Sequence, residues 1–251
     1  MKQKTRQDIL KINEVFTTHL IDVQITKHDP SNYEYSERER VILDDSGKCV
    51  ILTKEKANEL NAENRDYFNS NKDINPFDLK TDVKWIDGTT LISSKTDASS
   101  YLIDIGEALE TLRKKLGSKN LIVMGDWITP WLYQDNDYKP VKEVLDWLKK
   151  QIDSDFNGGF LLRGIELIQF IPKLFWLIRC NASLPEFMMT FENCKTIFSI
   201  CKYGVLHIES YDQDELNYIF EFFSGRRFRQ VDDCCNNPVN FDNFNGRKIL
   251  I

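Results

Sequence analysis

The pattern of apolar and polar positions is most informative in the second half of the chain, where short apolar runs alternate with polar segments. Three short apolar runs occur there, at residues 175–178, at residues 187–191, and at residues 197–201 continuing into 205–208. Each run is rich in aromatic or β-branched side chains, and Asn, Ser and Pro separate the runs. Such a pattern is typical of antiparallel strands joined by hairpins. We therefore expect three strands, with Tyr203-Gly204 forming a bend or bulge within the third.

The segment that follows predicts one helix and a last strand. Asp212 is suited to cap the helix, with Glu215 three residues later as its capping-box partner. Gly225 stands where a left-handed C-cap belongs, and residues 227–231 alternate between polar and apolar like a half-exposed strand. The order strand, strand, strand, helix, strand predicts an α+β fold, with a mostly antiparallel sheet covered by amphipathic helices.

The most regular helical stripe of the chain lies between Asp97 and Gly117. Asp97 has the side chain of an N-cap, and Gly117 follows the last apolar position. A short buried strand at 121–124 comes next, and Pro140 begins a further helix. We expect the stripe to pack on the sheet, and this set of residues to be almost inaccessible to solvent: Leu109, Leu112, Trp176, Ile178, Phe198, Ile200, Leu206 and Phe220.

The N-terminal part carries weaker signals. Residues 1–25 have apolar side chains at spacings of three and four, which predicts a helix. Residues 41–52 predict a hairpin around Asp-Asp-Ser-Gly, and Thr53 is suited to cap the helix after it. A polar stretch then suggests a boundary between an N-terminal subdomain at residues 1–75 and a main domain at 76–251, although one continuous domain fits the same pattern.

Length and charge narrow the classes of function. A chain of 251 residues is long enough to bury a sizeable core, and its formal net charge is -6. This charge gives no general attraction to nucleic acid but suits a basic protein partner. The sequence has no run of about 18 apolar residues, so we expect no membrane span.

Six cysteines are present, including the adjacent pair Cys234-Cys235, and no CxxC motif occurs. The first residues lack the apolar segment of a secretory signal, which favours a cytoplasmic protein with reduced thiols. We therefore interpret the cysteines as packing residues rather than disulfide or zinc ligands. Neither a Walker A loop nor a GxGxxG motif occurs, so we expect no cofactor.

One carboxylate stands at a position that is familiar from metal enzymes. Asp126 follows Gly125 at the end of a predicted strand, as in many metal-dependent phosphoesterases. Those enzymes need histidines nearby, and the three of this chain are His19, His28 and His207. We expect no metal site and name no catalytic residue, but a metal-dependent hydrolase acting on phosphoesters around Asp126 is the alternative function.

Aromatic and acidic side chains crowd the loop after Asp126. Trp127, Trp131 and Tyr133 are followed by Asp135 and Asp137. Tryptophan and tyrosine dominate the energetics of protein interfaces, so this composition indicates a partner-binding patch. In the competing interpretation the two tryptophans pack into the core and only the aspartates are exposed.

Together these features predict a protein-binding module. Its negative charge and its aromatic-acidic loop suit an immunity or inhibitor protein that neutralises a basic toxin or enzyme. The sequence leaves open whether the chain is an enzyme.

Overall fold

The computed structural model describes residues 1–36, 41–43, 46–73, 83–133, 135–180, 186–232, 239 and 249–250, the backbone alone at 41–42 and 249–250. Its helices are α1 (Arg6–Leu10), α2 (Glu14–His28), α3 (Lys54–Asn71), α4 (Ala98–Lys115), α5 (Lys139–Leu148), α6 (Gly164–Arg179), α7 (Gln213–Gly225) and the short 3-10 helix Pro30–Tyr33. Its strands are β1 (Lys2–Lys4), β2 (Val41–Leu43), β3 (Cys49–Ile51), β4 (Asp87–Ser93), β5 (Leu121–Gly125), β6 (Asp135–Asn136), β7 (Gly159–Leu162), β8 (Phe187–Phe191), β9 (Thr196–Ile200), β10 (Leu206–Ser210), β11 (Phe228–Gln230) and β12 (Ile249–Leu250).

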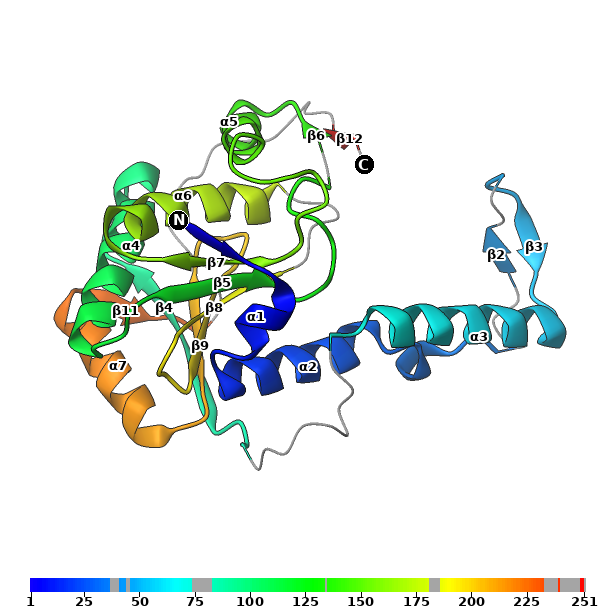
Figure 1. Ribbon diagram of the computed structural model, residues 1–251, viewed down its shortest axis with the longest axis horizontal. Coiled ribbons are helices and arrows are strands. Elements are labelled where there is room, and N and C mark those ends of the chain that lie inside the picture. Colours follow the sequence, from blue (N-terminus) through cyan, green and yellow to red (C-terminus); the bar gives the residue numbers. More distant parts are fainter. Residues whose placement is uncertain are drawn as a thin grey trace. The chain divides into compact units, whose positions relative to one another are not determined.

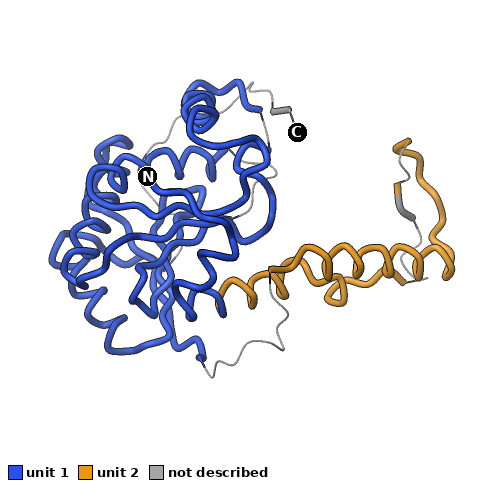
Figure 2. Tube along the Cα trace, viewed as in Figure 1, with its two compact units in different colours: residues 1–18, 80–251 blue, residues 19–79 orange. Residues whose placement is uncertain are grey.

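The chain divides into two compact units, shown in Figure 2. Unit 1 contains residues 1–18 and 80–251, and unit 2 contains residues 19–79. The first 18 residues thus belong with the sheet, and α2 runs across the division. Whether the chain folds as the two domains 1–75 and 76–251 stays a prediction.

Unit 1 is an α+β structure around an antiparallel sheet, as expected (Figure 1). Among the described residues the sheet has eight strands, in the order β1-β7-β5-β8-β9-β10-β4-β11. A continuous apolar row crosses its centre, because Val123 pairs with Met189, Met189 with Phe198, and Phe198 with Ile208. Paired residues point to the same face, so this row forms one side of the main core.

Helices cover that face, and their apolar side chains join those of the strands in one cluster. The cluster includes residues of α4, α5, α6 and α7. Gly106 of α4 lies so close to α6 that a Cβ there would stand 2.8 Å from the carbonyl oxygen of Ile168. Asp97 caps α4 by accepting from the N–H of Ser100, and Gly117 ends it with a φ of +64°, which confirms both predicted ends.

The opposite face is also buried at the centre of the sheet. Ile122, Met188 and Ile197 are almost inaccessible there, although they lie outside the main cluster. The Asn13 side chain, between α1 and α2, donates to the carbonyl oxygens of Phe191 (3.0 Å) and Cys194 (2.8 Å). These bonds tie the N-terminal segment to β8 and to the turn after it. Cover on both faces explains why the central strands read as continuous apolar runs.

The predicted central strands need two corrections. Residues 175–178 lie in α6 rather than in a strand, and β9 and β10 form a hairpin rather than one bent strand. Short apolar runs do not distinguish a strand from a buried helix, and α6 is apolar on most of its surface. The two errors compensate each other, so the expected strand-strand-strand-helix-strand order describes β8, β9, β10, α7 and β11.

The helix α7 has the predicted N-cap, but not the predicted capping box or C-cap. Asp212 caps α7 by accepting from the N–H of Glu215 at 3.1 Å, but the carboxylate of Glu215 accepts from the N–H of Lys195 instead of closing a capping box. The left-handed residue is Arg227, with a φ of 66°, not Gly225.

Of the residues predicted to form the core, five are buried: Leu109, Leu112, Phe198, Ile200 and Leu206. The other three, Trp176, Ile178 and Phe220, are half-buried at the edge of the core.

The first 25 residues form three elements rather than one helix. Lys2–Lys4 is a strand that pairs with β7, and α1 and α2 follow it. This strand carries no apolar alternation, and its long-range partner at residues 159–161 is what makes it extend.

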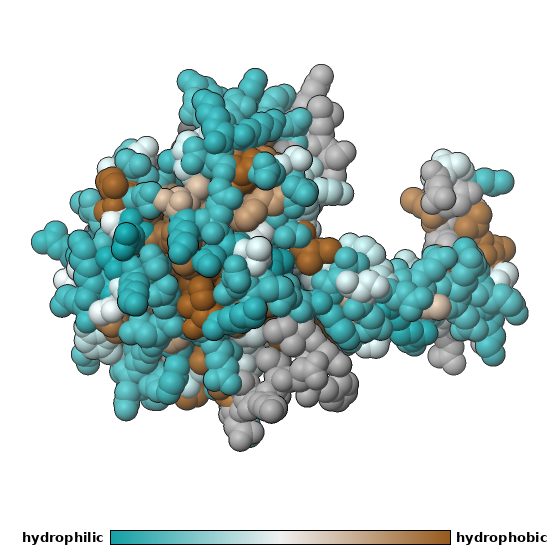
Figure 3. Space-filling view, viewed as in Figure 1, coloured by the Kyte–Doolittle hydropathy of each residue, from teal (hydrophilic) through white to brown (hydrophobic). Residues whose placement is uncertain are grey.

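Unit 2 contains most of α2, the 3-10 helix, the β2–β3 hairpin and α3. The hairpin and the Thr53 cap of α3 are confirmed, since the Thr53 hydroxyl accepts from the N–H of Lys56. Leu43 and Ile51 of the hairpin are 67% and 78% exposed, and apolar surface is visible on the hairpin in Figure 3. The adjacent pair Cys234-Cys235 lies outside the described residues.

Candidate functional site

Trp131 is the buried anchor of the aromatic-acidic loop. It is only 1% exposed, and its indole N–H donates to the carbonyl oxygen of Gly158 at 2.9 Å. Its ring stacks on Phe187 at a centroid distance of 4.2 Å and meets the edge of Phe160 at 4.8 Å. Trp127 is also buried. Both tryptophans therefore pack into the core, as in the competing interpretation, and Trp131 does not contribute to an exposed binding patch.

Arg6 holds the beginning of the same loop, and nothing in the local sequence pointed to it. Its guanidinium is buried and donates to the carbonyl oxygens of Gly125 (2.9 Å), Trp127 (2.8 Å) and Asn157 (3.3 Å). A buried charge needs such a set of acceptors to offset the loss of water. The signal was missed because β1 must pair with β7 before Arg6 comes near this loop.

Asp126 lies inside this arrangement rather than on the surface. It is 2% exposed, and its N–H donates to the carbonyl oxygen of Glu186 at 2.8 Å. Across the described ranges, no group of three or more His, Cys, Asp or Glu side chains is arranged to hold a metal ion. Hydrolysis around Asp126 stays a prediction, and this geometry adds no support to it.

The outer part of the loop presents one aromatic and two carboxylates to solvent. Tyr133 is 52% exposed, and Asp135 and Asp137 are exposed. Between these aspartates the buried Asn136 donates to the carbonyl oxygen of Cys180 at 3.2 Å. The backbone of β6 also pairs with β12. We call Tyr133, Asp135 and Asp137 the loop surface.

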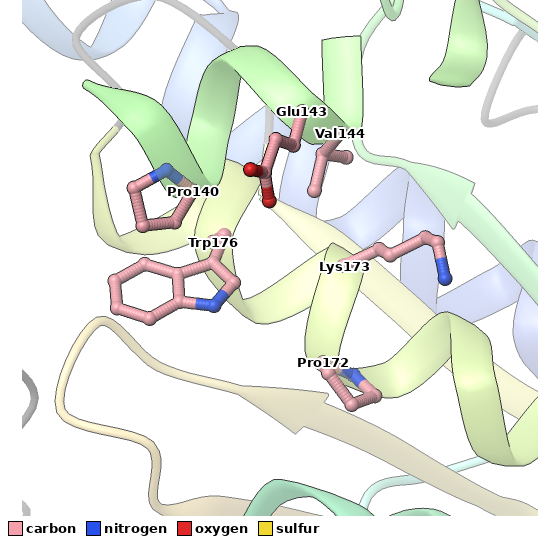
Figure 4. Close-up of a pocket in the computed structure, with 6 residues that line it drawn as sticks. All are labelled: Pro140, Glu143, Val144, Pro172, Lys173 and Trp176. Atoms are coloured by element: carbon pink, nitrogen blue, oxygen red, sulfur yellow. The ribbon is translucent and has the colours of Figure 1, made fainter. Parts of the chain in front are cut away.

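A pocket opens between α5 and α6, close to the end of this loop. Its volume is about 230 Å³, and its lining residues are Pro140, Glu143, Val144, Pro172, Lys173 and Trp176. The Glu143 carboxylate and the Trp176 ring point toward the same space, whereas the ammonium of Lys173 points away (Figure 4). The ring of Tyr138, which precedes α5, lies 5.9 Å from that of Trp176. The sequence pattern does not predict this pocket, because it favours a strand at residues 175–178.

The two charged groups of the pocket, Lys173 and Glu143, differ in how firmly their present partners hold them. Lys173 lies 5.0 Å over the Trp147 ring and donates to the carbonyl oxygen of Gln169 at 3.0 Å. Burial lowers the pKa of its ammonium. Glu143 forms a long ion pair of 3.9 Å with Lys139, and both side chains are well exposed. The Glu143 carboxylate is therefore the group that remains open to a ligand.

Among the described residues, four cysteines form no disulfide: Cys49, Cys180, Cys194 and Cys201. Burial, together with the nearby Glu215 carboxylate, strongly raises the pKa of the Cys194 thiol. A thiol with a raised pKa is a poor nucleophile, and the Cys194 side chain packs in the main apolar cluster.

Comparisons with protein families, with curated proteins and with solved structures found no match for this chain. Within the described part of the chain, no helix combines the length and the apolarity that crossing a membrane requires.

Proposed function

We propose that this protein binds another protein through the loop surface. The observation that carries the proposal is the contrast within one loop, where Trp131 is 1% exposed and Tyr133 is 52% exposed. A tyrosine held out by a buried neighbour loses little conformational freedom when it enters an interface. The loop surface therefore resembles a preorganised contact patch.

Charge suggests the kind of partner. Asp135 and Asp137 follow Tyr133 in the sequence and are exposed, and the whole chain has a formal net charge of -6. The Asp135 carboxylate pairs with Lys149 at 2.9 Å, but both side chains are half or more exposed, so a partner's cation can replace that lysine. A basic toxin or enzyme, neutralised by this chain as an immunity or inhibitor protein, fits such a surface.

The experiment is a pulldown from the native host with wild type, Tyr133→Ala and Tyr218→Ala side by side. Tyr218 on α7 is 42% exposed, so its substitution is a matched control for the loss of an exposed tyrosine. We expect Tyr133→Ala to weaken the complex by about 2 kcal/mol or more and Tyr218→Ala to leave it unchanged. Equal retention of one partner by all three proteins would contradict the assignment to the loop surface.

The double substitution Asp135→Asn with Asp137→Asn tests whether the carboxylates speed the encounter with a basic partner through long-range attraction. We expect it to slow association at low salt and to have a smaller effect at high salt, because exposed charges are screened. The hydrolase alternative makes the opposite prediction, in which Asp126→Asn abolishes turnover of a phosphoester panel. No stable partner, together with metal-dependent turnover that Asp126→Asn removes, would reject protein binding.

A further inference from the structure

The pocket between α5 and α6 combines the two groups that a guanidinium binds best. A carboxylate is supplied by Glu143, and an aromatic face is supplied by Trp176. Cations are attracted to the face of an indole ring, and carboxylates form charge-assisted hydrogen bonds with them. From this juxtaposition we infer that the pocket receives an arginine side chain of the partner, an inference that rests on the proposed protein-binding function.

The charged group that faces the pocket is a carboxylate. Among the described residues that line it, Glu143 and Lys173 are the charged ones, and the ammonium of Lys173 points away from the pocket (Figure 4). Lys173 already has the Trp147 ring and the Gln169 carbonyl oxygen as partners. Glu143 has the long contact with Lys139, whose side chain is 88% exposed, so a ligand can displace that pair at little cost.

The shape of the site favours arginine over lysine. Trp176 offers a flat ring, and the prolines Pro140 and Pro172 line the same pocket. A planar guanidinium stacks on such a surface while two of its parallel N–H groups bond one carboxylate. An ammonium is a more strongly hydrated point charge and cannot make both contacts in this way.

The size of the pocket fits one side chain. Its volume of about 230 Å³ is below the range of about 300–1,000 Å³ that is typical of small-molecule sites. The pocket also adjoins the end of the loop, since Tyr138 follows Asp137 directly in the sequence and its ring lies 5.9 Å from that of Trp176. An arginine in the pocket would thus lie next to the segment that carries the loop surface.

The probe is N-acetyl-L-arginine methylamide, with the citrulline and lysine methylamides as controls. Citrulline has nearly the same shape as arginine but carries no charge. The probes are titrated into the full ¹⁵N-labelled chain, and the Trp176 indole signal, assigned by its loss in Trp176→Phe, is followed by NMR. We expect a saturable shift with the arginine amide, a several-fold weaker one with the lysine amide, and none with the citrulline amide.

Two matched variants test whether the Glu143 carboxylate is the charge that binds the arginine amide. Glu143→Gln should weaken binding of the arginine amide about tenfold, since a charge-assisted hydrogen bond is lost. Asp146→Asn removes the same charge from an exposed position of the same helix outside the pocket, so it should leave the titration unchanged. Circular dichroism of both variants checks that the fold is retained.

Equal shifts with all three amides, or an unchanged titration in Glu143→Gln, would overturn the inference. Equal binding of the lysine amide alone would overturn the assignment to arginine. These results are independent of the pulldown, because the probes need no partner. A pulldown that fails while the arginine amide binds rejects the proposed function, and a pulldown that succeeds without arginine binding rejects the pocket.

Discussion

Unit 1 and unit 2 differ in how completely they cover the apolar side chains of their strands. In unit 1 every residue of β5 and β8 is buried, and the interior is a continuous apolar cluster. In unit 2 the hairpin exposes Leu43 and Ile51, while polar Asn61 is buried and bonds the backbone N–H and carbonyl of Tyr35, both at 2.9 Å. Cover on both faces, rather than the number of apolar residues, decides where burial stabilises the fold.

The aromatic-acidic loop of unit 1 shows the same contrast between covered and exposed apolar side chains within three residues. Trp131 belongs to the core, whereas Tyr133 belongs to the surface. We therefore expect the free energy of unfolding to depend strongly on unit 1 side chains such as Trp131, and weakly on exposed side chains of either unit.

The largest effect is expected for Trp131→Ala. Truncating a fully buried aromatic side chain costs about 3–5 kcal/mol, and here it also removes the hydrogen bond to Gly158. Urea unfolding measures the change, with Tyr133→Ala as the control, which should change stability by no more than about 0.5 kcal/mol. Similar costs for the two substitutions would show that burial does not distinguish them.

A similar but smaller loss is expected for Leu112→Ala. Leu112 of α4 is 0% exposed and lies in the main cluster, so its truncation should cost about 2–5 kcal/mol. The measurement is again the urea midpoint, with Leu43→Ala of the hairpin as its counterpart. A Leu43→Ala effect as large as that of Leu112→Ala would contradict the contrast between the units.

The third prediction concerns pH and His19, the first residue of unit 2. Burial, with a further contribution from Lys27, lowers the pKa of His19 from 6.5 to about 4. Because the folded-state pKa is the lower one, the unfolded chain binds more protons between these values. The stability contributed by the neutral imidazole is therefore present above about pH 6.5 and is lost as pH falls toward 4.

The shift corresponds to at most about 3 kcal/mol between pH 7 and pH 4. His19→Gln should therefore lose less stability than wild type over this range, as read from urea midpoints at both pH values. His207 of β10 is the comparison in unit 1, since burial lowers its pKa while Glu186 opposes the change. An identical pH dependence of wild type and His19→Gln would disprove the assignment.

The smallest effect is expected for Ile51→Ser on the hairpin. Ile51 is 78% exposed, so the polar side chain should change the free energy of unfolding by less than about 0.5 kcal/mol. The measurement is thermal unfolding of wild type and variant. A loss above 1 kcal/mol would mean that Ile51 is covered in the folded protein.

Much of the fold was predictable because its signals are local. The Asp97 cap, the Gly117 end and the apolar stripe of α4 lie within one stretch of sequence, and each acts through neighbouring backbone groups. The inner face of α5 is equally local, at Val141, Val144, Leu145 and Leu148. The candidate site was predictable only in part: its loop was found by composition, but the exposure of each aromatic was not.

The sequence by itself determined the α+β class, the N-caps Thr53, Asp97 and Asp212, and the position of the aromatic-acidic loop. Only the tertiary structure decided that residues 175–178 are helical, that Lys2–Lys4 is a strand, and that Arg6 bonds the carbonyl oxygen of Gly125. These outcomes depend on partners more than 100 residues away or on which faces neighbouring elements cover. Local propensity contains neither, because burial is a property of the packed chain and not of a short segment.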